Sequence, residues 1–270
     1  MSLPAWRPGP AMLVTAAFIG PGTVTACASA GLGFGAALLW ALAFATLATI
    51  ILQNMAARVA IVTGKGLAEA ILGAASSLPF RWALGLLIFA ALAIGNAAYQ
   101  AGNISGTAIG LSLAGYGASG DAARESVLGI GLLAAALVIV GKPRWLEALL
   151  IGLVLAMAAA FTGALLVIDI DWRAAFAGLA PVVPAGGLLT AIALIGTTIV
   201  PYNLFLHAAS VRGQFAADAA GIASARMDTV VSVTLGGLLS MAIVVIAAAA
   251  QGKTAGDASP LVQVAARLQD

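Results

Sequence analysis

Gly20-Pro21-Gly22-Thr23 breaks an apolar run that extends from Ala11 to Leu39, and Val200-Pro201-Tyr202-Asn203 breaks a second run from Gly186 to Val211. A proline inside a helix removes one backbone hydrogen bond and clashes with the preceding turn. In lipid, backbone groups freed in this way are costly unless protein or trapped water satisfies them. Paired interrupted helices in corresponding halves of a chain are typical of the binding site of a secondary transporter. We therefore predict helix breaks at Pro21 and Pro201 around a central cavity.

The composition is that of a polytopic membrane protein. Of the 270 residues, 62% are hydrophobic and 8% are charged, and the mean hydropathy is +1.09; soluble domains of this size differ strongly from these values. The single cysteine, Cys27, excludes an internal disulfide and a cysteine-only metal cluster. The one histidine cannot anchor a catalytic triad, and no zinc, dinucleotide or ATP motif is present. We expect neither an enzyme nor a resident cofactor, and the net charge of +2 gives no reason to expect a nucleic-acid partner.

Seven segments can be drawn as membrane spans, because a bilayer core needs about 20 apolar residues per helix. The connections are short, so a single transmembrane domain over residues 1–270 is predicted. The segment 251–270 is more polar and is predicted to be a loop. The predicted spans are 11–34 (broken), 36–62, 83–113, 125–141, 145–168, 186–211 (broken) and 228–250.

The distribution of Lys and Arg indicates the orientation. With a cytoplasmic N-terminus, eight of these residues fall in inside loops or helix ends and four fall outside. The positive-inside rule therefore predicts an N-terminus in the cytoplasm. The inside set is Arg7, Arg58, Lys65, Arg81, Lys142, Arg144, Arg212 and Arg226, and the outside set is Arg124, Arg173, Lys253 and Arg267.

Carboxylates are predicted to be absent from the middle of the membrane. All ten acidic residues fall in loops or at predicted helix ends, including Asp228 at the start of the last span. Intramembrane carboxylates are the usual equipment of cation sites and proton relays. The sequence therefore predicts a site built without them.

Five stretches follow one another in a specific order and spacing: residues 18–23 (FIGPGT), Leu39-Trp40, residues 51–69 (ILQNMAARVAIVTGKGLAE), residues 106–111 (GTAIGL) and residues 201–207 (PYNLFLH). In them the chain resembles the NRAMP family of proton-coupled manganese and iron transporters. The resemblance implies an all-α, LeuT-like fold of two inverted repeats, in which broken helices one and six face each other. About seven of the ten or more helices of that fold are found here. We therefore expect a chain truncated at its C-terminus, or one that pairs with a partner supplying the missing helices.

The resemblance also implies where metal ligands should lie, and the chain is a divergent member at those positions. The Asp and Asn of the family's helix-one motif ligate the metal, and the matching positions are Gly20 and Thr23. A Met before the proline of helix six supplies a sulfur ligand in the family, and the matching position is Val200. On this basis, Gly20→Asp combined with Val200→Met is predicted to strengthen transition-metal binding.

The residues around the two breaks are our candidates for binding a cation or solute. Unwound carbonyl groups suit hard or weakly bound cations. The N-termini of the half-helices could instead hold an anionic group, and the alternative to both is a pair of hinges that bind nothing. The candidates are Gly20, Gly22, Thr23, Thr197, Val200, Tyr202 and Asn203.

A polar track is predicted beside the breaks. Asn96, Gln100 and Asn103 lie at i, i+4 and i+7, on one face of an otherwise apolar span. The alternative to a pore-facing track is amide bonding between helices, worth about 0.6 kcal/mol per pair. Asn203 and His207 also share a helix face, and His207 either gates an inner vestibule or simply bonds a neighbouring helix. In the resemblance, Gln100 and Asn103 match two acidic residues of the family's proton path, and the family's helix-six His is kept as His207.

The sequence thus predicts an integral membrane transporter, resembling NRAMP proteins, in a bacterial inner membrane. Its expected cargo is a divalent cation, Mn²⁺, Mg²⁺ or Fe²⁺, moved by alternating access with uncertain proton coupling. Two alternatives remain. One is transport of a small polar or zwitterionic organic solute, and the other is a membrane sensor or scaffold that transports nothing.

Overall fold

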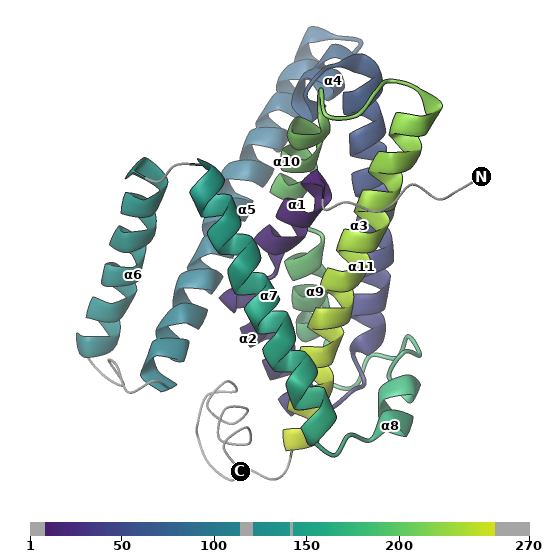
Figure 1. Ribbon diagram of the computed structural model, residues 1–270. Helices are drawn as coiled ribbons and strands as arrows, with labels where there is room; N and C mark the ends of the chain where they lie inside the picture. The colour runs from purple at the N-terminus through teal and green to yellow at the C-terminus, as the bar shows by residue number, and fades with distance from the viewer. Residues whose placement is uncertain (1–8, 114–120, 141–142, 252–270) are drawn as a thin grey trace.

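The computed structural model describes residues 9–113, 121–140 and 143–251, and every regular element within those ranges is an α-helix (Figure 1). The prediction of an all-α protein is therefore confirmed. The helices are α1 (Pro10–Phe18), α2 (Pro21–Phe34), α3 (Leu39–Thr63), α4 (Leu67–Gly73), α5 (Leu78–Leu113), α6 (Asp121–Val140), α7 (Pro143–Val167), α8 (Trp172–Ala177), α9 (Leu188–Thr198), α10 (Pro201–Val211) and α11 (Ala219–Ala250).

Two apolar segments are broken in mid-course. α1 and α2 are bent by 57° at Ile19 and Gly20, and α9 gives way to α10 at Ile199 and Val200. Each second half begins with its proline, Pro21 in α2 and Pro201 in α10. Proline is well tolerated at this first position, because an N–H there would have no partner within the helix. Each proline therefore ends one half-helix and begins the next.

The core of the molecule is a bundle made of α1, α2, α3, α9, α10 and α11. α11 packs against α1, α2 and α3, and α3 packs against α9 and α10. The apolar window of α11 is 61% buried, whereas none of the corresponding window of α5 is buried. Every polar side chain that is buried within the described ranges also lies on these six helices. We refer to them as the bundle.

Helices α5, α6 and α7 lie outside the bundle (Figure 1). α5 contacts α2 and α10, α6 contacts α5, and α7 contacts α1 and α11. Their large apolar side chains are widely exposed, Leu86 and Leu132 among them, as is typical of helices whose outer faces meet lipid. α5 packs against α2 and α7 packs against α1, so both helices lie beside the first break.

Fewer spans meet the length and composition of a membrane helix than the seven predicted. The described residues contain five, or six if the bent pair α1–α2 is counted as one span. The predicted span at 125–141 corresponds to α6, of which Glu125–Val140 is the apolar part.

α11 begins at Ala219 and not near residue 228, so one sequence prediction is wrong. Asp218 caps α11 by accepting a hydrogen bond from the Gly221 N–H at 2.7 Å. Asp228 therefore lies inside the helix, where it is buried, and not at a helix end. The predicted membrane span 228–250 leaves out the first turns of α11, although their alanines favour a helix.

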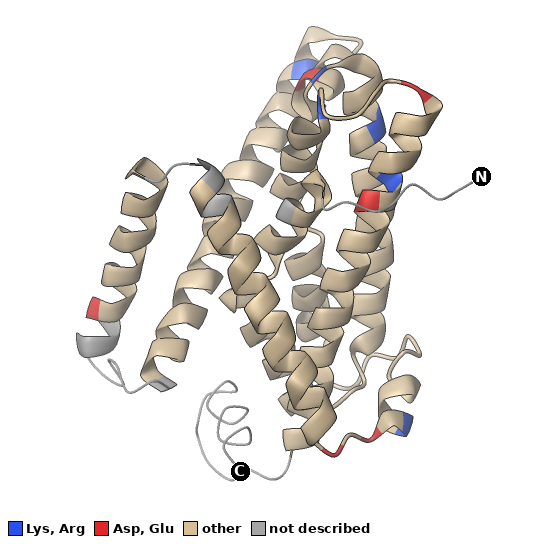
Figure 2. Ribbon diagram, in the orientation of Figure 1, with Lys and Arg blue, Asp and Glu red and all other residues tan. Residues whose placement is uncertain are grey.

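Charged side chains gather at the two ends of the helices, and the midsections are nearly free of them in the described residues (Figure 2). The loop before α4 carries Lys65 and the end of α10 carries Arg212, and these two helices contact each other. α8, at the opposite end, carries Arg173 (Figures 1 and 2). Arg7, Lys142, Lys253, Arg267, Asp257 and Asp270 lie outside the described residues, as does nearly all of the predicted loop 251–270.

Candidate functional site

At the first break, side-chain hydroxyl groups form hydrogen bonds with the freed backbone carbonyls. The carbonyl oxygens of Ala17 and Phe18 lose their helical partners where α1 ends. The Tyr202 hydroxyl donates to the Ala17 oxygen at 2.9 Å. The hydroxyls of Tyr99 and Thr23 both donate to the Phe18 oxygen, each at 2.6 Å. These two freed carbonyls are therefore already satisfied in this conformation.

Thr23, our side-chain candidate on the first broken helix, lies behind the break. Its side chain is fully buried. The hydroxyl bonds the Phe18 carbonyl and lies 3.2 Å from the Tyr99 hydroxyl. In this conformation the Thr23 hydroxyl satisfies a backbone carbonyl of the break and is not free to bind a cation or solute.

Asn103 of α5 meets the break from the other side. Its Oδ1 accepts a hydrogen bond from the Gly22 N–H at 3.2 Å. A Cβ added to Gly20 would lie 2.7 Å from the same oxygen. The amide of α5 therefore occupies the space that a side chain at position 20 would need.

The second break is held more by packing than by side-chain hydrogen bonds. Val200 is buried against Phe18, Ile19 and Leu239. The Thr198 carbonyl accepts a long bond from the Thr49 hydroxyl at 3.4 Å. The apolar contacts at Val200 thus bring the second break against the end of α1.

Thr197, also a candidate, turns back onto its own helix. Its hydroxyl donates to the Leu194 carbonyl at 2.8 Å. A Thr hydroxyl within a helix commonly makes such a bond to the preceding turn. The structure gives it no contact with the cavity described next.

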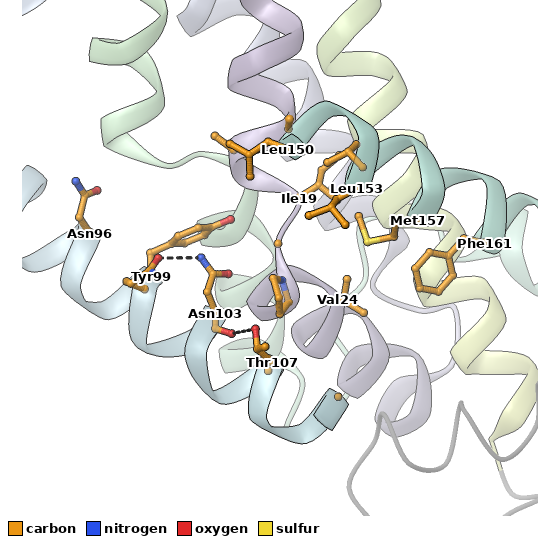
Figure 3. A pocket seen from close by; sticks show the side chains of 18 of the residues that line it. Ile19, Val24, Asn96, Tyr99, Asn103, Thr107, Leu150, Leu153, Met157 and Phe161 are labelled. Carbon is orange, nitrogen blue, oxygen red and sulfur yellow. Dashed lines mark hydrogen bonds between the residues drawn. The ribbon is translucent and has the colours of Figure 1, made fainter. Parts of the chain in front are cut away.

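A cavity of about 1070 Å³ opens beside the first break (Figure 3). One wall is the break itself, with Gly20 and Pro21, and Tyr202 closes it from α10. The second wall comes from α5 and is polar. The third comes from α7 and is apolar, with Leu153, Met157 and Phe161.

The predicted track is the polar wall of this cavity. Asn96, Gln100 and Asn103 all line it, together with Tyr99. Asn103 donates through Nδ2 to Gln100 Oε1 at 3.4 Å, and the Thr107 hydroxyl donates to the Asn103 carbonyl at 2.8 Å (Figure 3). The structure therefore places these three amides together beside the break.

Asn203 and His207 lie on the other side of α10, inside the bundle. Both are buried, and neither lines the cavity. The Thr229 hydroxyl donates to the Ala225 carbonyl at 2.9 Å and lies 3.2 Å from His207 Nε2. Neither polar atom of the Asn203 amide has a hydrogen-bond partner among the described residues. Of the candidates on α10, Tyr202 therefore lines the cavity, whereas Asn203 and His207 lie inside the bundle.

Sequence reasoning missed two features of the site. The apolar wall from α7 gave no signal, because its residues look like any other membrane helix. The role of Asp228 was also missed: its carboxylate accepts the N–H groups of Gly9 at 3.0 Å and Ala11 at 2.9 Å. It thereby binds the start of α1 to α11, and the polar residue spacing in α11 could have suggested a helix there.

Carboxylates and other strong metal ligands do not converge. Within the described ranges, no three His, Cys, Asp or Glu side chains come together as a metal site. The polar atoms at the cavity are neutral amides and hydroxyls. The arrangement can therefore offer oxygen ligands and hydrogen bonds to a guest, without a fixed negative charge.

Comparison with known proteins places the chain in a family. A family model described as natural resistance-associated macrophage protein-like (Nramp) matches residues 11–270. The divalent metal cation transporter MntH of Verminephrobacter eiseniae is 31% identical over 90% of this chain and 55% of its own length. MntH 1 of Pseudomonas aeruginosa is 32% identical over 90% of this chain and 56% of its own length. The chain thus spans about half the length of the curated relatives it matches.

Solved structures show the same fold. A manganese transporter of Eremococcus coleocola, in complex with an aromatic bis-isothiourea compound, superposes with a TM-score of 0.70 at 24% identity. The match covers 90% of this chain and 51% of that protein. The LeuT-like architecture expected from the sequence is therefore confirmed, with part of its helices present. The family that the five sequence stretches resemble is also confirmed, and the chain belongs to the natural resistance-associated macrophage protein-like (Nramp) family.

Proposed function

We propose that this chain serves in secondary transport of a divalent cation by alternating access, with the substrate site beside the two helix breaks. The observation that carries the proposal is the hydrogen bond from Tyr202 to the Ala17 carbonyl, which joins the start of α10 to the end of α1. Broken helices that meet at mid-membrane are where transporters of this architecture bind their cargo. The relatives are about twice as long, so the proposed activity is that of the complete transporter.

The groups at the cavity favour a hard cation. Amide oxygens of Gln100 and Asn103 are ligands that Mg²⁺ and Mn²⁺ accept. Val200 supplies no sulfur, and sulfur ligands are what softer cations prefer. We therefore place Mg²⁺ and Mn²⁺ ahead of Fe²⁺ as cargo.

The proposal includes a place in the cell and an orientation. Bacterial relatives dominate those described above, which favours a bacterial inner membrane. The basic residues near α4 and the end of α10 favour a cytoplasmic position for that end of the molecule, and hence a cytoplasmic N-terminus. A single cysteine introduced as Lys65→Cys in a Cys27→Ala background should react with an impermeant thiol reagent only from the cytoplasmic side. Labelling from the periplasmic side alone would show the opposite orientation.

Uptake into proteoliposomes tests the proposed function. The full chain should accumulate Mn²⁺ or Mg²⁺ above the equilibrium level. Gly106→Ala should lower uptake by about tenfold, because its Cβ would lie 2.6 Å from the Pro21 carbonyl oxygen and overpacking typically costs 1–3 kcal/mol. Gly95→Ala on the same helix is the matched control, because no described atom lies within 4 Å of its added Cβ. Absence of uptake by the correctly folded complete transporter would refute cation transport.

A second candidate function is transport of a small organic solute. The apolar wall from α7 faces the neutral amides of α5 across a cavity far larger than a bare cation. Solute pockets commonly combine an apolar lining with a few polar groups. Uptake of a zwitterionic solute such as glycine betaine, without uptake of Mn²⁺ or Mg²⁺, would favour this candidate. Lack of uptake of either would leave a sensor or scaffold.

A further inference from the structure

α2 begins without a capping side chain of its own. Its N-cap residue is Gly20, which has no side chain, and its first residue is Pro21, which has no N–H. Gly22 carries the first free N–H of the helix. Ser, Thr, Asp or Asn at an N-cap normally accepts such a group, and replacing one by Ala typically costs about 1 kcal/mol.

The missing cap comes from another helix. Asn103, 81 residues further along the chain, accepts the Gly22 N–H through Oδ1 at 3.2 Å. It belongs to the C-terminal third of α5 and lines the cavity. Because only the oxygen of an amide can accept, this bond fixes the orientation of the Asn103 side chain.

Three glycines make room for this contact. An added Cβ would lie 2.7 Å from Asn103 Oδ1 at Gly20, and 3.1 Å from the same oxygen at Gly22. At Gly106 it would lie 2.6 Å from the Pro21 carbonyl oxygen. The first turn of α2 and the C-terminal third of α5 therefore fit together only with small residues at these positions, as close helix contacts in membranes require.

We propose that Asn103 is a positioning residue that caps α2 from α5, in place of a side chain at position 20, and so holds the polar wall of the cavity against the first break. The proposal rests on the proposed function only in making this break the transport site. The cap itself is a property of the fold and is measured without transport.

The consequence for the site is a fixed hydrogen-bond order. Gly22 donates to Asn103 Oδ1, so the Asn103 Nδ2 group faces Gln100 Oε1 at 3.4 Å. The Gly22 N–H thus fixes the orientation of the Asn103 amide, and that amide in turn orients the Gln100 side chain in the cavity wall. Removing Asn103 would free both the start of α2 and the Gln100 side chain.

Hydrogen exchange in the full-length protein tests the cap. Asn103→Ala should speed exchange in the first turn of α2 by about tenfold, the size of effect that a lost cap gives. Asn103→Asp keeps an acceptor oxygen and should leave this exchange close to that of the wild type. Asn96→Ala, on the same face of α5 but without a contact to Gly22, should not change exchange in the first turn of α2.

A sharper test introduces a capping side chain at the N-cap position of α2 itself. Gly20→Ser alone should lower the melting temperature, because its Cβ would meet Asn103 Oδ1. Combined with Asn103→Ala, the same Ser gains room, caps α2 locally and should restore both slow exchange and the melting temperature. The proposal is overturned if Asn103→Ala leaves exchange unchanged, or if the double variant is no better than Asn103→Ala. If the wild type shows no uptake while the exchange results hold, the proposed function fails and the cap stands.

Discussion

The Tyr202 hydroxyl donates a hydrogen bond to the Ala17 carbonyl oxygen at 2.9 Å, across 185 residues of sequence. Tyr202 is the second residue of α10, and Ala17 lies in the last turn of α1. The bond uses a carbonyl that became free because α1 ends at Phe18. The two breaks are therefore not independent features, since the start of one half-helix satisfies the end of another.

Removing this hydroxyl should loosen the contact between the breaks. Tyr202→Phe leaves the Ala17 carbonyl without its partner, and a typical hydrogen bond contributes about 0.5–1.5 kcal/mol. We expect a lower melting temperature and reduced uptake. Phe176→Leu, at an exposed position of α8, is a control that should change neither. Unchanged melting and uptake in Tyr202→Phe would show that the bond does not couple the breaks.

Asp228 should be the most sensitive acidic residue among those described. Asp228→Ala leaves the partly buried Gly9 N–H and the buried Ala11 N–H without their acceptor, and an unsatisfied buried group costs about 1–3 kcal/mol. Asp218→Ala removes an exposed cap from α11 and should cost about 1 kcal/mol. Thermal unfolding of both variants should therefore show a larger loss for Asp228→Ala. Equal losses would mean that the bond to α1 contributes little.

The contact between α2 and α11 gives a pair of matched substitutions. A Cβ added to Gly31 would clash with the Val244 carbonyl oxygen, whereas one added to Gly33 meets no described atom within 4 Å. Gly31→Val should prevent a stable, monodisperse preparation in detergent. Gly33→Val should behave like the wild type in size-exclusion chromatography. Comparable behaviour of the two variants would contradict the backbone contact between α2 and α11.

The structure changes the expected result of adding the missing ligands. The sequence predicts that Gly20→Asp with Val200→Met strengthens transition-metal binding. Because the amide of Asn103 fills the space at Gly20, we now expect that gain only when Asn103→Gly is added to make room. Calorimetric titration with Mn²⁺ of the double and triple variants checks this. A full gain in the double variant would show that Asn103 moves aside freely.

Much of the fold could be predicted from the sequence because its signals are local. Pro21 and Pro201 predict the breaks because proline has no N–H and clashes with the preceding turn. Long apolar runs predict the spans. The start of α11 could not be placed in the same way. Its first turns consist mainly of alanine with Ser224, Arg226 and Asp228 interspersed, and the helix propensity of alanine, more than hydropathy, continues the helix there.

The site could be predicted only in part, because it depends on which face of each helix is buried. The spacing of Asn96, Gln100 and Asn103 correctly grouped them on one face of α5, and all three line the cavity. The sequence predicts one site for the neighbours Tyr202 and Asn203, yet Tyr202 lines the cavity and Asn203 lies in the bundle. Consecutive residues of a helix point about 100° apart, and the sequence does not reveal which of them faces the cavity.

The central claim is a cation site beside the first break, and titration of the full-length, folded protein with Mn²⁺ and Mg²⁺ tests it most directly. The account predicts saturable binding that is weakened by Gln100→Leu, in the polar wall of the cavity, and unaffected by Leu86→Met, at an exposed position of the same helix. No saturable binding of either ion, or binding that Gln100→Leu leaves unchanged, would contradict it.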